Sequence, residues 1–248
     1  MEYVTEEEIE ERTEKAAQVT PITPYYSIIL VVSIVVVSFV QIATDLEASV
    51  IVAGFVKPLF LAGEYWRILT SAALHAGLMH IGFNSYALFV LGRLIEILSN
   101  RAHLAVVFLC SVIGGNILSL VFGPDAPSIG ASGGVIGFLG YLTVYGFKRR
   151  ALLSNAFLKN MLFNVGLITF LGVFVIPNVD NFAHLGGFLV GAIYGLVQIP
   201  RDVHEDPRET DGLTNIFGYI SIGIFLLTCL FSILLITGVI GLPYTEFQ

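Results

Sequence analysis

Residues 130–140 read GASGGVIGFLG and open an apolar run that extends to about residue 147. Glycine is about 1 kcal/mol less favourable than alanine in a helix interior, and a serine, Ser132, stands among these glycines. Small residues let the backbones of membrane helices approach each other closely. The stretch therefore predicts a membrane helix that packs tightly against another helix, with a serine in its first turn.

The composition of the whole chain indicates a lipid environment. Of its 248 residues, 56% are hydrophobic and only 12% are charged, whereas soluble domains have about 25% charged residues. Because so little charge cannot coat a globule in water, we expect a membrane protein, and the apolar segments described next predict that it is all-α. Cys110 and Cys229 both lie inside apolar runs, which predicts two free thiols and no disulfide.

Seven apolar segments follow the polar start of the chain. They lie at about 25–43, 79–99, 103–122, 131–147, 158–177, 183–199 and 214–240. A membrane helix needs about 20 apolar residues, with about 17 as the lower limit, so the fourth and sixth segments are close to that limit. Residues 44–78 are too polar and broken for another span, and we expect them to form an interfacial excursion that holds Trp66 and Arg67.

These segments divide the chain into parts of different character. We expect an acidic cytoplasmic tail at 1–24, a six-helix domain at 25–199, a cytoplasmic linker at 200–213, a seventh transmembrane helix at 214–240 and a short outer tail at 241–248. The acidic tail has seven Glu, one Arg and one Lys. It is unlike a secretory signal peptide, because such peptides begin with positive charge.

The distribution of Lys and Arg predicts the orientation of the helices. With the amino terminus inside, ten of these residues fall on the inner side and only two, Lys57 and Arg67, fall outside. Inner loops of membrane proteins carry an excess of positive charge. We therefore expect a multi-pass protein with its amino terminus inside. The membrane that we expect it to occupy is the cytoplasmic membrane of a prokaryote.

Five polar side chains occur towards the outer ends of three segments. They are His75, His80 and Asn84 at the second segment, Ser132 at the fourth and His184 at the sixth. Each alone has a structural explanation, because a membrane serine bonds to the preceding turn, an asparagine joins helices and a buried histidine can be hydrogen-bonded within the fold. Their similar depth instead favours one site with the parts of acyl transfer: a nucleophile, a base and hydrogen-bond donors.

Glycines recur every four residues on the two segments that carry Ser132 and His184. They are Gly133 and Gly137 on the fourth segment, and Gly187, Gly191 and Gly195 on the sixth. Both polar side chains are short, so a hydrogen bond of about 2.6–3.2 Å between them requires close helix contact. We expect these glycines to bring the two helices together with Ser132 facing His184, although ordinary small-residue packing would have the same spacing.

Two other chemistries are disfavoured. Residues 130–134 match G-x-S-x-G, the nucleophile elbow of α/β hydrolases, but that motif needs a strand before it and a helix after it. Membrane-length apolar segments flank it here. A zinc site of His75, His80 and His184 lacks a carboxylate or Cys partner at the same depth.

Taken together, these residues resemble the rhomboid intramembrane serine proteases. The matching positions are Trp66-Arg67, then His75, His80 and Asn84, then Gly130-Ala131-Ser132-Gly133, and finally Ala183-His184 with Gly187 and Gly191. The resemblance covers about residues 25–199, and the combination is far more specific than G-A-S-G alone. It implies a rhomboid-like bundle of six helices with a water-filled cavity open to the outer face, and the seventh helix looks like the carboxy-terminal addition of some members.

The resemblance also implies roles for individual residues. Ser132 is expected to be the nucleophile and His184 the base, with His80, Asn84 and the Ser132 N–H as oxyanion donors. The other matching positions are expected to support the site: His75, Gly130, Gly133, Gly187, Gly191, Trp66 and Arg67. The implied partners are the bilayer and membrane-protein substrates with a transmembrane segment, with no cofactor, metal or nucleic acid. His75 lies about 140° around a helix from His80, so we expect it to face elsewhere and support the fold or the loop.

Two positions complicate this resemblance. Several family members have an aromatic residue four positions after the serine, where this chain has Ile136, so the His184 ring is expected to be held less firmly. Asp180 lies four residues before His184 and suggests a catalytic triad. It belongs to a polar loop, and the family has no such acid, so a dyad is favoured.

Two further functions stay open at this point. One is a catalytically silent relative that binds and escorts membrane proteins, although the dyad is complete here. The other is a transporter or receptor, but the inverted repeats expected of transporters are not visible and the polar residues do not extend across the membrane.

Overall fold

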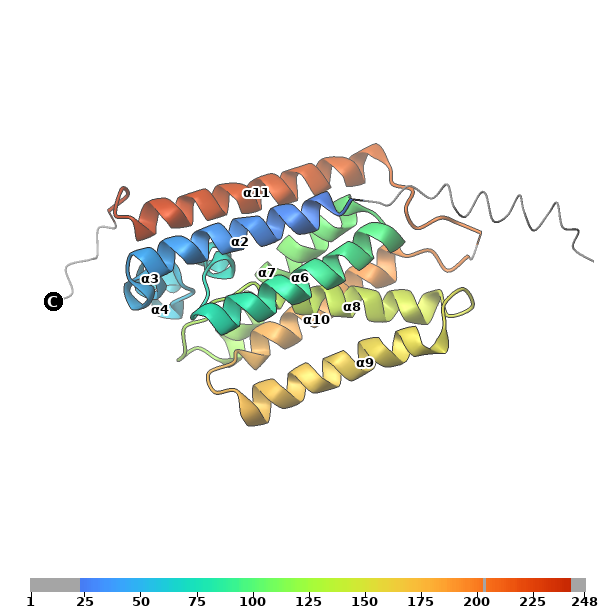
Figure 1. Ribbon diagram of the computed structural model, residues 1–248, viewed down its shortest axis with the longest axis horizontal. Coiled ribbons are helices and arrows are strands. Elements are labelled where there is room, and N and C mark those ends of the chain that lie inside the picture. The colour runs from blue at the N-terminus through green and yellow to red at the C-terminus, as the bar shows by residue number, and fades with distance from the viewer. Residues whose placement is uncertain (1–22, 203, 242–248) are drawn as a thin grey trace, which may run out of the picture.

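The computed structural model describes residues 23–202 and 204–241, and this part of the chain folds as an all-α bundle (Figure 1). Its long helices are α2 (Tyr25–Ala43), α6 (Leu78–Leu98), α7 (Arg101–Phe122), α8 (Ser132–Lys148), α9 (Asn155–Phe170), α10 (Asn181–Gln198) and α11 (Gly212–Ile236). The described residues contain no strand, only an isolated antiparallel bridge between Phe55 and Ser128. The α/β-hydrolase interpretation of the serine motif is therefore excluded. Nearly all of the acidic tail at 1–24 and of the outer tail at 241–248 lies outside the described residues.

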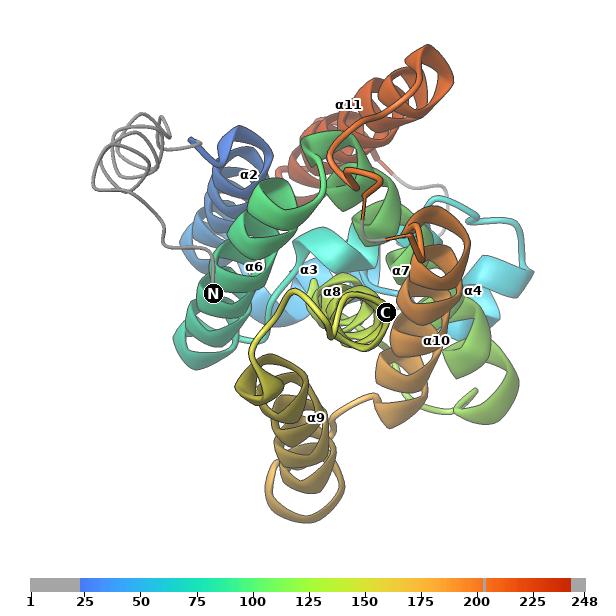
Figure 2. The same ribbon diagram turned by 90° about the vertical axis from the view of Figure 1, so that its right-hand side faces the viewer.

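Among the described residues, five helices are long and apolar enough to cross a membrane: α2, α6, α7, α9 with its continuation to Val175, and α11. The protein is thus an integral, multi-pass membrane protein. The two glycine-rich helices are shorter, with 17 residues in α8 and 18 in α10. Figure 2 shows α8 near the middle of the bundle, with α6, α7, α9 and α10 around it. Because protein rather than lipid surrounds it, α8 does not need the length of a lipid-facing span.

Residues 44–77 fold as short helices at one end of the bundle and add no further span. They form α3 (Leu46–Ala53), α4 (Lys57–Leu61), α5 (Arg67–Thr70) and the 3-10 turn η1 (Ser71–Ala73). The start of α3 is capped by Asp45, which accepts hydrogen bonds of 2.9 Å from the backbone N–H groups of Glu47 and Ala48. Because α2 ends and α6, α8 and α10 begin at this end (Figure 1), we call it the Ser132 end.

The contact between α8 and α10 depends on glycine. A methyl group added at Gly187 would overlap the carbonyl oxygen of Gly133, and one added at Gly191 would overlap that of Gly137. One helical turn further, Gly195 lies against the Tyr141 ring. The backbones of the two helices are thus in direct contact along the faces that carry these glycines.

The helices α9 and α11 lie on opposite sides of the bundle (Figure 1). In α9 only Met161 is buried, and the helix continues as a π-helical turn, η2 (Leu171–Val175). In contrast, α11 packs on α2 and α7, where Gly218 lies against the backbone of Ala102.

The expected end of α11 needs correction. The starts of α9 and α11 lie within three residues of the expected ones, but α11 ends at Ile236 rather than near residue 240. The Asp211 carboxylate caps the start of α11 by accepting a hydrogen bond of 2.7 Å from the Thr214 N–H. Near its end, Gly238 has a φ of 73°, a left-handed conformation that ends helices.

Candidate active site

Ser132 is the first residue of α8, and Gly130 shapes the turn before it. Gly130 has a φ of 116°, and its N–H donates a hydrogen bond of 2.9 Å to the Ser71 carbonyl. A methyl group at Gly130 would lie 2.8 Å from both Cε1 and Nε2 of His80 and 3.8 Å from Oγ of Ser132. The His80 ring and the Ser132 hydroxyl therefore lie beside the same glycine. Both the positive φ of Gly130 and the closeness of the His80 ring exclude a side chain at this position.

A backbone contact determines the tautomer of His80. The Ala76 N–H donates a hydrogen bond of 3.2 Å to Nδ1 of His80, so Nδ1 is an acceptor and the ring proton belongs to Nε2. That Nε2–H is the side of the ring beside Gly130 and Ser132. One turn later on α6, the buried Asn84 side chain donates to the His80 carbonyl at 3.0 Å, which leaves its second amide proton for another acceptor.

His75 lies next to His80 rather than away from it, so the helical extrapolation was wrong. The reason is that α6 begins only at Leu78, after Gly77 with a φ of 121°. The two rings meet edge to face with their centroids 5.0 Å apart. Burial, together with the neighbouring His80, lowers the pKa of His75 below its ordinary value, so the ring is neutral.

The His75 ring connects α2 to the backbone in front of Ser132. Its Nδ1 contacts Oγ of Ser38 at 3.2 Å, and its Nε2 accepts a hydrogen bond of 3.4 Å from the Ala131 N–H. The backbone N–H of His75 donates to Oε1 of Gln41 at 2.9 Å. His75 thus holds the turn that leads into α8.

His184 lies in the first turn of α10, close to the start of α8. The carbonyl oxygen of its neighbour Ala183 lies 3.7 Å from the position that a methyl group on Gly133 would take. The backbones next to Ser132 and next to His184 therefore adjoin each other. Among the described residues, Nδ1 of His184 is buried without a hydrogen-bond partner, and the predicted Ser132–His184 hydrogen bond is not formed. Catalytic hydrogen bonds are often long in unliganded enzymes.

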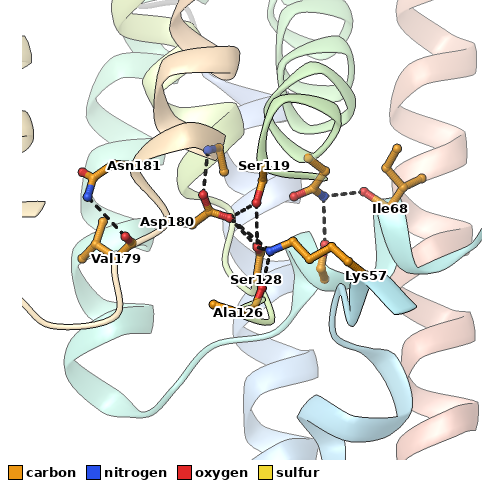
Figure 3. A network of polar contacts seen from close by, with 11 residues as sticks. Lys57, Ile68, Ser119, Ala126, Ser128, Val179, Asp180 and Asn181 are labelled. Atoms are coloured by element: carbon orange, nitrogen blue, oxygen red, sulfur yellow. Dashed lines mark hydrogen bonds and ion pairs between the residues drawn. The ribbon is translucent and has the colours of Figure 1, made fainter. Parts of the chain in front are cut away.

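Asp180 does not form a triad with His184. One carboxylate oxygen accepts a hydrogen bond of 2.9 Å from the Ala183 N–H and so caps α10, and the other accepts hydrogen bonds from the hydroxyls of Ser119 and Ser128 (Figure 3). Its roles are thus capping and cross-linking.

Two further positions of the pattern that the sequence analysis identified, Trp66 and Arg67, lie in the segment of short helices. Arg67 is 1% exposed and pairs with Glu64 at 2.6 Å, while its Nη1 donates to the Gly54 carbonyl at 2.8 Å. The Trp66 ring meets Phe231 of α11 edge to face at 6.0 Å. Arg67 thus cross-links the short-helix segment internally, and Trp66 packs this segment against α11.

Sequence reasoning missed several polar residues that hold the site. Asn116, in the second half of α7, donates hydrogen bonds to the Ile68 carbonyl at 2.7 Å and to Oγ of Ser71 at 3.0 Å, and Ser71 in turn accepts a hydrogen bond from Gly130. A polar residue inside an apolar run was a signal that could have found Asn116. Lys57 entered only the charge count, and Ser119 and Ser128 were not considered.

Comparison with known proteins decides the family. The family model of the Rhomboid domain matches residues 62–201. This chain belongs to the rhomboid family. The rhomboid match takes in all the positions discussed above from Trp66 to Gly195 and leaves α2 and α11 outside.

Named relatives of this rhomboid chain include proteases. It is 35% identical over 150 residues to the rhomboid protease GluP of Bacillus subtilis (strain 168). The matched region is 60% of this chain and 29% of GluP. It is 34% identical over 164 residues to RHOMBOID-like protein 6, mitochondrial, of Arabidopsis thaliana, covering 62% and 51% of the two chains. The putative rhomboid protease YdcA of Bacillus subtilis (strain 168) is 34% identical over 133 residues, covering 52% and 66%. The chain thus spans about a third to a half of the first two relatives.

Proposed function

We propose that this rhomboid-family chain is a serine endopeptidase that hydrolyses peptide bonds in or near the transmembrane segments of other membrane proteins. Ser132 is the nucleophile and His184 the general base, a dyad without an aspartate. The site opens to the outer face of the membrane, and the amino terminus lies inside. No metal or cofactor takes part in this proposal.

The proposed reaction begins when Oγ of Ser132 attacks the scissile carbonyl carbon and His184 takes the hydroxyl proton. The resulting oxyanion accepts hydrogen bonds from Nε2–H of His80, from the Asn84 amide and from the backbone N–H of Ser132. The C–N bond then breaks, and His184 passes its proton to the leaving amine. Water, deprotonated by His184, hydrolyses the acyl-enzyme and frees Ser132.

The observation that carries this proposal is the arrangement around Gly130. The His80 ring and Oγ of Ser132 share the space beside this glycine, with the proton of His80 on the nitrogen that faces it. Ser132 is also the first residue of its helix, so its N–H has no intrahelical partner. Two hydrogen-bond donors therefore adjoin the hydroxyl, as acyl transfer requires.

The test combines a serine-directed fluorophosphonate probe with cleavage of a membrane substrate in proteoliposomes. The unmodified chain should react with the probe and release fragments that mass spectrometry identifies. Ser132→Ala and His184→Ala should each abolish both signals while the protein stays helical and inserted, because the first removes only a hydroxyl and the second a side chain that is only partly buried. The two residues act as one unit, so the double variant should be no worse than either single one.

Other outcomes would point to the alternatives. Clear cleavage by purified Ser132→Ala would refute the dyad. A chain that binds membrane proteins but neither reacts with the probe nor cleaves them would be the silent escort considered above.

A further inference from the structure

A second polar cluster lies at the Ser132 end, apart from the proposed dyad. It consists of Lys57, Ser119, Ser128 and Asp180, which we call the Lys57–Asp180 network (Figure 3). These residues come from four places: α4, α7, the loop before α8 and the residue before α10. The mechanism proposed above uses none of them.

The two carboxylate oxygens of Asp180 have different tasks. Oδ1 accepts a hydrogen bond of 2.9 Å from the Ala183 N–H, which fixes the first turn of α10. Oδ2 accepts hydrogen bonds from the hydroxyls of Ser119 and Ser128, and those two hydroxyls are 3.2 Å apart. One side chain therefore joins the start of α10 to α7 and to the loop that leads into α8.

Lys57 completes the network with a buried positive charge. Its side chain is 2% exposed, and its Nζ lies 3.8 Å from Oδ2 of Asp180. The same ammonium donates a hydrogen bond of 2.8 Å to Oγ of Ser128 and another to the Ala126 carbonyl. Next to it, Phe55 and Ser128 exchange backbone hydrogen bonds of 3.0 and 3.2 Å. The loop before α8 is thus held by the segment around α4 through both backbone and charge.

The electrostatics favour the charged form of the Asp180 carboxylate. Burial raises the pKa of Asp180, but the hydrogen bonds from Ser119, Ser128 and the Ala183 N–H, together with the charge of Lys57, leave the pKa below its ordinary value. Burial lowers the pKa of Lys57, and the Asp180 carboxylate opposes that shift. Removing either partner leaves a buried charge uncompensated, which is strongly unfavourable.

The spacing of the network relates it to the dyad. Ser128 lies four residues before Ser132, and Asp180 lies four residues before His184. We propose that Asp180, held by Lys57, is a positioning residue that sets the distance between the Ser132 and His184 side chains. This inference rests on the proposed function, since it assumes that those two residues react together.

The test replaces charge while keeping shape. Asp180→Asn and Lys57→Met should each lower kcat for a reconstituted membrane substrate at least tenfold with KM unchanged, and slow fluorophosphonate labelling of Ser132 equally. Because the two residues act on one geometry, the double variant should be little worse than either single one. Lys57→Arg keeps the charge and should have most of the rate that Lys57→Met loses. Ser128→Ala, which removes one hydroxyl and keeps both charges, should give a smaller loss and serves if Asp180→Asn fails to fold.

The matched control is Asp206→Asn, because Asp206 also pairs with a cation, Arg208 at 2.7 Å, but its side chain is 35% exposed and lies in the linker. It should leave kcat unchanged. A second readout does not depend on activity: amide hydrogen exchange at 128–133 and 181–185 should rise in Asp180→Asn and not in Asp206→Asn.

Each result then has a definite meaning. If Asp180→Asn keeps the full kcat, or if exchange at both segments is unchanged, the positioning role is refuted. If the unmodified chain neither cleaves nor labels, the proposed function fails, and hydrogen exchange still decides whether Asp180 holds the two segments.

Discussion

At the scale of single residues, the polar side chains on α6 have distinct surroundings and should have distinct importance. His80 lies beside Ser132 with Nε2–H free to donate, whereas Asn84 already bonds the His80 carbonyl with one amide proton. His75 touches the backbone of Ala131 rather than the space beside Gly130. The surroundings thus rank the three residues by their closeness to the reacting atoms.

We predict that Asn84→Ala and His80→Ala each slow turnover about 10²–10³-fold, because that is the usual cost of losing one oxyanion donor. His80→Ala should be at least as damaging, since its ring also fills space against His75. His75→Ala should be milder than either, and Ser132→Ala and His184→Ala should leave no detectable activity. The measurement is cleavage of a reconstituted substrate at matched amounts of folded enzyme. Full activity in both Asn84→Ala and His80→Ala would show that the donors lie elsewhere.

Residues of the site differ in how well the sequence could predict them. Ser132 and His184 stand out because a polar residue is costly inside an apolar run, and the glycines around them explain how closely their helix backbones approach. The position of His75 could not be extrapolated, because the break at Gly77 depends on a backbone conformation. The pairing of Lys57 with Asp180 could not be predicted either. The two residues are far apart in sequence, and charged residues are common in loops for many reasons.

At the scale of elements, the contact between α8 and α10 has no room for a side chain. We predict that Gly187→Ala and Gly191→Ala destabilise the protein by about 1–3 kcal/mol, the usual cost of overpacking, and that both reduce labelling of Ser132 by the fluorophosphonate probe. The physical reason is that each new methyl group overlaps a carbonyl oxygen of α8, so the helices must separate. Thermal unfolding in detergent gives the stability, and probe kinetics give the reactivity.

The matched control for these variants is Gly166→Ala in α9. A methyl group there has no atom within 4 Å, so only helix propensity changes, by up to about 1 kcal/mol in favour of alanine. If Gly187→Ala behaved like Gly166→Ala, the close contact between α8 and α10 would not limit stability.

The helices themselves were predictable because each is an apolar run interrupted by polar or charged loops. Their ends were less so, as α11 shows: its bounds depend on the cap at Asp211 and the left-handed Gly238. The short helices α3, α4 and α5 are held by tertiary contacts such as that of Arg67 with Gly54, which no local pattern announces.

At the scale of the whole molecule, the alternating helices place 149–154 and 123–131 at opposite ends of the bundle. The charge distribution predicts that the first of these loops lies inside the cell and the second outside. In a chain whose Cys110 and Cys229 are replaced, Leu152→Cys should react with an impermeant maleimide only after the membrane is opened. Asp125→Cys, the control at the other end, should react in intact cells. Both side chains are exposed. Labelling of Leu152→Cys from outside would reverse the orientation, and with it the side on which the site opens.

The packing of α11 against α2 and α7 has a consequence for how the protein is made. Translation proceeds at about 5–20 residues per second, so the stretch between Phe122, where α7 ends, and Gly212, where α11 begins, takes roughly 5–20 s. During that interval lipid tails must cover the surface around Ala102 that Gly218 later contacts. Lipid tails are as apolar as a leucine side chain, so lipid can cover this surface until α11 binds and the nascent protein does not aggregate. A nascent chain therefore passes through a stage at which the helices from α2 to α10 are complete. The exposed surface of α2 and α7 is then the binding surface for α11, which has not yet left the ribosome.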